Sequence, residues 1–254
     1  MIPVTEAVER LLAAVPAPPE VESVHLAMAL HRVLAQDLHS TVTVPPRDNS
    51  AVDGYALRYQ DLSADSSHLP VSQRVVAGSR PSPLAAGTAA RIFTGASVPE
   101  GADTVVMQED CVVDEAGLAV PALETVRPGA NIRRRGQDVE QGALVAAAGT
   151  RLSPRHIGLL GSVGLAQLPV FRRLRVAVLS TGDELVEPGE PSHDGQIYNS
   201  NRYLLCGLLS QAGFEPVDLG RVEDRLDATH AALTRAAEAA DLVLTTGGVS
   251  VGEE

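Results

Sequence analysis

Hydrophobic and polar positions follow three different patterns along the chain, and the first pattern is helical. Apolar side chains recur at helical spacing, at Val4, Val8, Leu11, Leu12 and Val15. The spacing predicts an amphipathic helix, for which Thr5 is a candidate cap and Pro16 a stop. Apolar residues between positions 26 and 34 predict a second short helix, and alternation over residues 37–44 predicts a strand.

From about residue 47 to residue 137 the pattern favours β structure. Short β-branched runs there are separated by glycine and proline; they cover residues 71–76, 90–94, 104–108, 111–113 and 118–123. Ser153 and Pro154 then predict the start of a helix that ends at Gly164. We expect this helix to pack with the first two. The result is a discontinuous N-terminal domain, residues 1–46 plus 138–168, with an all-β domain, residues 47–137, inserted in it.

After Pro169 the pattern alternates between strands and helices, which predicts a parallel sheet. The strands cover residues 175–179, 215–219 and 241–245, and the helices cover residues 201–212 and 227–240. If the second and third strands flank the first, the loops after the first and third strands open side by side at a topological switch point.

The fold class is therefore multidomain, α+β and α/β, and residues 169–254 form a partial parallel-sheet α/β domain. Such a sheet normally continues beyond a glycine-rich loop with a covering helix and further strands. We expect the sequence to be the front part of a longer enzyme.

Composition limits the partners and the location of the protein. The 254 residues carry 20 basic and 32 acidic side chains. The net charge of −12 disfavours nucleic acid and anionic membranes as partners, and no apolar run approaches the ~20 residues that span a bilayer. Cys111 and Cys206 lie far apart without a Cys-x-x-Cys pattern, which supports neither a disulfide framework nor a zinc site and fits a cytoplasmic location.

Three polar segments of the first two predicted domains are candidates for a functional site. Asp53 lies in a turn over residues 48–56, Thr94 follows a strand, and Asp138 follows three consecutive arginines. Each segment also has a simpler interpretation, as an ordinary turn, a hairpin corner or a solvated charge run. All basic side chains are arginine, so this part of the protein would hold a phosphate through guanidinium groups or backbone N–H groups.

Two loops of the α/β domain are the strongest candidates. The first is Ser180-Thr181-Gly182-Asp183-Glu184, in which Asp183 is an expected helix cap and Glu184 the better candidate for an acid that faces a ligand. The second covers residues 247–252, whose glycines can form a backbone nest for an anion without the lysine of a Walker A loop. Asp53, Asp138 and Glu184 together with such a nest would suit the binding of Mg²⁺ against a phosphate or another oxyanion.

Seven segments, in the same order, resemble one known family. They are residues 49–56 (NSAVDGYA), 92–99 (IFTGASVP), 101–106 (GADTVV), 131–133 with 136–138 (NIR and GQD), 180–185 (STGDEL), 200–201 (SN) and 247–252 (GGVSVG). This series is similar to the MoeA family of molybdopterin molybdenumtransferases, whose eukaryotic relative is the E domain of gephyrin.

The resemblance implies an enzyme of molybdenum cofactor biosynthesis. Such an enzyme inserts molybdate into adenylylated molybdopterin, releases AMP and uses Mg²⁺. The family fold also implies a further C-terminal β domain and a homodimer, with each active site between the α/β domain of one subunit and the inserted β domain of the other. A pterin adenylyltransferase is an expected partner, because it would supply the pterin nucleotide.

The resemblance also implies roles for particular residues. Catalytic roles fall on Asp53, Thr94, Asp138 and Glu184, and the three acids are the implied metal ligands. The pterin or nucleotide phosphate is expected near Ser180, Thr181, Gly182, Asp183, Gly247, Gly248, Ser250 and Gly252.

Two alternative functions remain open on the sequence. A molybdopterin adenylyltransferase uses a similar α/β domain, but it resembles residues 170–254 alone, and the β insert argues against it. A non-enzymatic scaffold similar to gephyrin would explain a dimer with a spare β domain, but the resemblance places partner binding in the late part of the fold, so this alternative ranks last.

Overall fold

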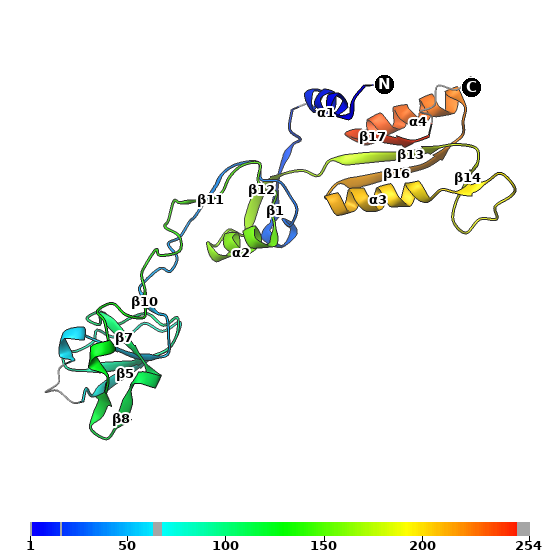
Figure 1. The fold of residues 1–254 in the computed structure, drawn as a ribbon. Coiled ribbons are helices and arrows are strands. Elements are labelled where there is room, and N and C mark those ends of the chain that lie inside the picture. Colours follow the sequence, from blue (N-terminus) through cyan, green and yellow to red (C-terminus); the bar gives the residue numbers. More distant parts are fainter. Residues whose placement is uncertain (1, 16, 63–67, 248–254) are drawn as a thin grey trace. The chain divides into compact units, whose positions relative to one another are not determined.

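The computed structural model describes residues 2–15, 17–62 and 68–247 (Figure 1). The chain divides into two compact units. The first unit contains residues 1–36, 147–157 and 167–254, and the second contains residues 37–146 and 158–166. Several sheets, including a three-stranded parallel sheet, and the helices between them give the mixed α/β and multidomain architecture that the sequence predicts. The finer division into three domains stays a prediction.

The first unit begins with helix α1 (Val4–Ala13), strand β1 (Val21–His25) and a 3-10 turn (Leu26–Met28). Strand β1 pairs antiparallel with β12 (Gln167–Phe171), from distant sequence. The N-cap of α1 is Pro3, so the prediction that Thr5 caps the helix is wrong. Helix α1 buries none of its side chains, and the predicted packing of its apolar stripe is not observed.

The prediction of a second helix between residues 26 and 34 is also wrong, because only the 3-10 turn over Leu26–Met28 forms there. Val33 and Leu34 instead form isolated antiparallel bridges with Arg151 and Val170, and Leu34 is fully buried. Pairing with distant segments therefore determines this backbone, and the local apolar spacing does not.

The α/β part of the first unit has a three-stranded parallel sheet in the order β16-β13-β17. The strands are β13 (Arg175–Thr181), β16 (Glu215–Val222) and β17 (Leu242–Thr246), and the connecting helices are α3 (Ser200–Ala212) and α4 (Leu226–Ala239). Strand β13 is buried from Val176 to Ser180, as expected for the central strand of a parallel sheet. The predicted strand order, with the second and third strands on either side of the first, is confirmed.

The loop after β13 contains a short parallel pair, β14 (Leu185–Val186) with β15 (Ile197–Tyr198). The backbone N–H of Ile197 donates to the carbonyl oxygen of Glu184 at 2.9 Å. This pairing begins directly after the predicted Ser180 to Glu184 loop, so no helix follows that loop.

The second unit is mainly β structure. Its largest sheet has the order β5-β6-β4-β7, with strands β4 (Gly54–Leu57), β5 (Val71–Val75), β6 (Ala89–Ile92) and β7 (Thr104–Met107). The smaller pairs are β8 (Val112–Asp114) with β9 (Gly117–Ala119), β3 (Asn49–Ser50) with β10 (Ile132–Arg133), and β2 (Leu38–His39) with β11 (Leu144–Ala146). Short 3-10 turns cover Tyr59–Asp61, Gln108–Asp110 and Leu123–Thr125.

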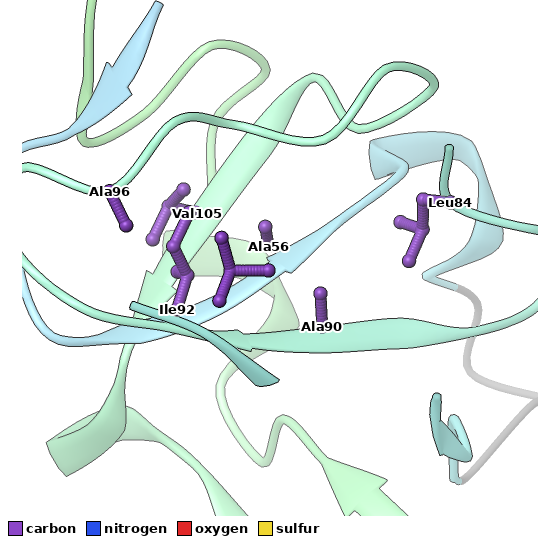
Figure 2. Packing of buried hydrophobic residues seen from close by; sticks show 7 residues of the cluster. Ala56, Leu84, Ala90, Ile92, Ala96 and Val105 are labelled. Atoms are coloured by element: carbon purple, nitrogen blue, oxygen red, sulfur yellow. The ribbon is translucent and has the colours of Figure 1, made fainter. Parts of the chain in front are cut away.

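Two apolar clusters stabilise this sheet. Figure 2 shows the first, which includes Ala56, Leu84, Ala90, Ile92, Ala96 and Val105, all buried. A second cluster gathers buried side chains from β4, β6, β7 and β9. Because successive residues of a strand point to opposite faces, the apolar side chains of β4 and β6 supply both clusters.

Helix α2 (Pro154–Ser162) starts and ends where the sequence predicts. Gly164 has φ +80°, and the N–H of Leu165 donates to the carbonyl oxygen of Leu160, which is the bond of a Schellman-type helix end. Across residues 2–15, 17–62 and 68–247, no helix has the length and apolar character needed to cross a bilayer.

Candidate functional site

The first group of predicted site residues meets at the end of strand β6. Thr94 donates two hydrogen bonds to Oδ1 of Asp53, from its backbone N–H at 2.8 Å and from its hydroxyl at 2.7 Å. We call Asp53, Thr94 and Arg91 the Asp53 cluster. The N–H and hydroxyl donors of Thr94, assisted by the charge of Arg91, hold the pKa of Asp53 below its usual range. Asp53 is therefore a carboxylate at neutral pH.

Arg91 is a member of this cluster that the sequence analysis missed. Its Nη1 donates to the carbonyl oxygen of Gly54 at 2.9 Å, and its Nη2 donates to Oε1 of Gln108 at 2.5 Å. A signal was present in the sequence, because Arg91 is a charged residue inside an otherwise apolar strand and lies three positions before Thr94. The register of β4 against β6 places Arg91 opposite Tyr55. This pairing, which the sequence does not show, brings Arg91 close to Asp53.

Asp138 and the arginine run form ion pairs in the second unit. Arg133 donates to Oδ2 of Asp138 at 2.5 Å, and Arg134 donates to Oδ2 of Asp48 at 2.6 Å. The backbone N–H of Arg135 also donates to Asp48. Two of the three guanidinium groups are thus neutralised by carboxylates, which makes the run a weak candidate for a phosphate site.

The second group of predicted residues lies at the carboxyl ends of β13 and β17. Ser180 and Thr246 are register partners, and the hydroxyl of Thr246 donates to the hydroxyl oxygen of Ser180 at 3.2 Å. The hydroxyl of Thr181 donates to the carbonyl oxygen of Thr246 at 3.3 Å. We call residues 180–184 and 246–247 the strand-end loops. They meet at the predicted switch point of the sheet.

Gly247 is needed for a close approach of backbone to backbone, and Gly182 lies against the carboxylate of Glu184. A Cβ at Gly247, which has φ +92°, would lie 2.5 Å from the carbonyl oxygen of Thr181. A Cβ at Gly182 would lie 2.3 Å from Oε2 of Glu184. The carboxylate of Glu184 therefore folds back over Gly182. Gly248, Ser250 and Gly252 lie outside the described residues.

Asp183 has a different role from the predicted helix cap. Its Oδ1 accepts a hydrogen bond from the backbone N–H of Asp224 at 3.3 Å, and Arg221 donates to the carbonyl oxygen of Leu185 at 2.7 Å. Asp183 thus ties the loop to the segment after β16. The helix-cap prediction is wrong because β14, and not a helix, follows this loop.

A small cavity adjoins the strand-end loops, with a volume of about 180 Å³. It is lined by Leu179, Thr181, Val222, Asp224, Thr229, Ala232, Leu233, Thr245 and Gly247. Cavities that enclose a whole drug-sized ligand are usually about 300 Å³ or larger. This cavity has room for only part of a nucleotide.

The three acids predicted to bind Mg²⁺ come from both compact units, Asp53 and Asp138 from the second and Glu184 from the first. Within residues 2–15, 17–62 and 68–247, no group of three or more histidine, cysteine, aspartate or glutamate side chains is placed to hold a metal ion. Asp53 nevertheless suits Mg²⁺, because only its Oδ1 accepts hydrogen bonds from described residues. Asp138 suits it less well while Arg133 occupies its Oδ2.

Comparison with protein families identifies both parts of the chain. Residues 2–164 match the family model described as the MoeA N-terminal region (domain I and II). Residues 177–254 match the model of a probable molybdopterin binding domain. These matches define a multidomain protein with an α/β domain of the molybdopterin-binding type. The chain belongs to the MoeA family.

Individual relatives agree with this assignment. The chain is 42% identical over 254 residues to a molybdopterin molybdenumtransferase of Haemophilus influenzae, covering 100% of this chain and 62% of the relative. It is 38% identical over 259 residues to that of Bacillus subtilis, covering 99% of this chain and 60% of the relative.

A solved structure is also similar along most of the chain. The crystal structure of a molybdopterin biosynthesis MoeA protein from Pyrococcus horikoshii superimposes with a TM-score of 0.86 at 34% identity, covering 98% of this chain and 67% of that one. The chain thus spans about three fifths of the length of the two curated relatives described above.

Proposed function

We propose that the complete protein inserts molybdate into adenylylated molybdopterin and releases AMP in a Mg²⁺-dependent reaction of molybdenum cofactor biosynthesis. The names of the relatives, molybdopterin molybdenumtransferases, support molybdopterin and molybdenum as the substrates, and the adenylylated form and the release of AMP come from the resemblance to the family. The observation that carries it is the Asp53 cluster, in which Thr94 holds an ionised carboxylate with one oxygen still available.

We further propose a homodimer in which the Asp53 cluster of one protomer and the strand-end loops of the other form one active site. The two groups have complementary chemistry. The Asp53 cluster offers a carboxylate and a hydroxyl, whereas the strand-end loops offer closely packed backbone and the carboxylate of Glu184. The proposal also includes a cytoplasmic location and a pterin adenylyltransferase as the partner that supplies the pterin nucleotide.

The residues have separate tasks in the proposed mechanism. Thr94 orients Asp53, and Asp53 with Glu184 would hold Mg²⁺, which supplies positive charge against the phosphate oxygens of the substrate. Gly182 leaves room for the carboxylate of Glu184 to fold back, and Gly247 keeps the backbone after β17 close to Thr181. Asp138, once separated from Arg133, is a candidate for a further ligand.

Molybdate-dependent release of AMP by the complete protein tests this function. We expect Glu184→Gln to lower the rate by about 10² to 10⁴, the usual contribution of a positioned acid or base. Glu238→Gln is the matched control, because Glu238 is exposed on α4, and it is expected to keep the wild-type rate. An unchanged rate in Glu184→Gln would remove Glu184 from the mechanism.

Removal of metal tests the second part of the proposal. EDTA is expected to abolish AMP release, and added Mg²⁺ is expected to restore it, because the phosphate oxygens would lose their counter-charge. Full activity in EDTA would exclude the metal. Consumption of ATP with free molybdopterin would instead favour the alternative function of adenylyltransferase.

A further inference from the structure

Arg91, a member of the Asp53 cluster, lies beside a second arginine, Arg74, on the neighbouring strand. Arg74 on β5 and Arg91 on β6 are register partners on neighbouring parallel strands. Their guanidinium carbons lie 4.7 Å and 4.6 Å from the centroid of the Phe93 ring. Unlike Arg133 and Arg134, which pair with Asp138 and Asp48, neither forms an ion pair within the described ranges.

The two guanidinium groups differ in how much hydrogen-bonding capacity they retain. Arg91 is half-buried, donates to Gly54 and Gln108, and lies 5.1 Å from the Tyr55 ring. Arg74 is exposed, and its side chain donates no hydrogen bond to any residue that the structure describes. Arg91 is therefore fixed in place, whereas the donors of Arg74 are available.

A bound anion would relieve the repulsion between the two guanidinium groups. Like charges on neighbouring strands repel each other. The Phe93 ring offsets part of that repulsion, because the face of an aromatic ring attracts a cation. Phe93 directly precedes Thr94, which donates to Asp53, so Arg74, which lies over the Phe93 ring, is at the same end of the sheet as the Asp53 cluster.

We propose that Arg74 and Arg91 form an oxyanion subsite in which Arg74 binds a tetrahedral oxyanion and Phe93 holds the guanidinium group in place. A guanidinium group binds such an anion through two parallel N–H donors. The subsite would complement Asp53, because the arginines would attract the anion and Asp53 would attract the metal ion that accompanies it. The identity of the anion rests on the proposed function, since both the phosphate of the pterin nucleotide and molybdate are tetrahedral oxyanions.

Calorimetric titration of the complete protein with AMP and, separately, with sodium molybdate tests the subsite and distinguishes the two anions. We expect Arg74→Gln to weaken the binding of at least one of them about tenfold. Arg74→Lys keeps the charge but lacks the planar pair of donors, so an intermediate affinity is expected. Arg235→Gln is the charge-matched control, because Arg235 is exposed on α4, and wild-type affinity is expected.

Three results would overturn the subsite: wild-type affinity of Arg74→Gln for both anions, an equal loss in Arg235→Gln, or no binding of either anion by the wild-type protein. The AMP-release assay separates this inference from the proposed function. If wild-type protein releases no AMP but Arg74→Gln loses anion binding, the subsite stands and the proposed function falls. If wild-type protein releases AMP and Arg74→Gln binds both anions normally, the subsite alone is wrong.

Discussion

At the scale of single residues, the contact between Asp53 and Thr94 connects local structure to chemistry. Asp53 lies in a turn before β4 and Thr94 in the turn after β6, and the antiparallel pairing of Gly54 with Ile92 brings the two turns together. A carboxylate that accepts two hydrogen bonds is both oriented and kept ionised. The electrostatics of the cluster can therefore be tested without substrate.

Thr94→Val is predicted to raise the pKa of Asp53 toward its ordinary value, because one of two donors is lost while the backbone N–H remains. The measurement is a carboxyl-carbon NMR titration of Asp53. Thr125→Val is a suitable control, since the hydroxyl of Thr125 donates to the carbonyl oxygen of Ala122. An Asp53 titration identical in Thr94→Val and wild type would disprove the assigned hydrogen bond.

The same pKa shift predicts a pH dependence of stability. The folded-state pKa of Asp53 is lowered, so its contribution is present above the unfolded-state value of about 3.9 and is lost as pH falls through the folded-state pKa. The difference in Tm between wild type and Thr94→Val is thus expected at neutral pH and should shrink as the pH falls below the unfolded-state pKa toward the lower folded-state pKa. A difference that grows on acidification would contradict the sign of the shift.

Cys111 is predicted to be an unreactive thiol in the folded protein. Burial, together with the charge of Asp110, raises the pKa of Cys111 to about 11. At pH 8 the thiolate fraction should fall about 10²-fold below that of an ordinary cysteine, whose pKa is about 8.5. The reaction of DTNB with a Cys206→Ser variant isolates Cys111. A rate equal to that of the unfolded protein would show that the side chain is accessible and ionised.

At the scale of secondary-structure elements, the ends of α2 follow from a few residues. Gly164 adopts φ +80°, a conformation that costs an L-residue about 1 kcal/mol. Gly158 lies in the interior of the same helix, where an added Cβ meets nothing within 4 Å. The two glycines therefore have opposite effects on stability.

Gly164→Ala is predicted to lower the free energy of unfolding by about 1 kcal/mol, whereas Gly158→Ala should raise it by about 0.5–1 kcal/mol. Thermal denaturation of both variants provides the measurement, and each variant serves as the control for the other. Stabilisation by Gly164→Ala would show that the left-handed end of α2 does not form in solution.

Elements that local pattern determines can be predicted from the sequence, and elements that pairing with distant segments determines cannot. The βαβαβ order and the end of α2 were predictable, because strand runs, helix spacing and Gly164 are local signals. The segment around Val33 and Leu34 was not, since its bridges to Arg151 and Val170 cannot be read from spacing. The place of Arg91 in the site likewise depends on the pairing of β4 with β6, which the sequence does not show. Asp53 and Thr94 were predictable because they lie in two of the segments that resemble the family.

At the scale of the whole molecule, the proposed active site needs groups from separate parts of the chain. Asp53 and Thr94 belong to the second compact unit, and residues 180–184 and 247 belong to the first. The proposed homodimer unites the Asp53 cluster of one protomer with the strand-end loops of the other. If each active site is shared between two protomers, a substitution in the Asp53 cluster of one protomer and a substitution in the strand-end loops of the other can complement each other. An active site within a single protomer would not allow this complementation.

A mixed dimer of the complete protein tests that claim most directly. One subunit carries Asp53→Asn and its partner carries Glu184→Gln, with different affinity tags so that the mixed dimer can be purified. Each mutant homodimer should be nearly inactive. The mixed dimer should recover about half of the wild-type rate of molybdate-dependent AMP release, because one of its two sites then has both native acids. A mixed dimer as inactive as the two mutant homodimers would contradict an active site shared between protomers.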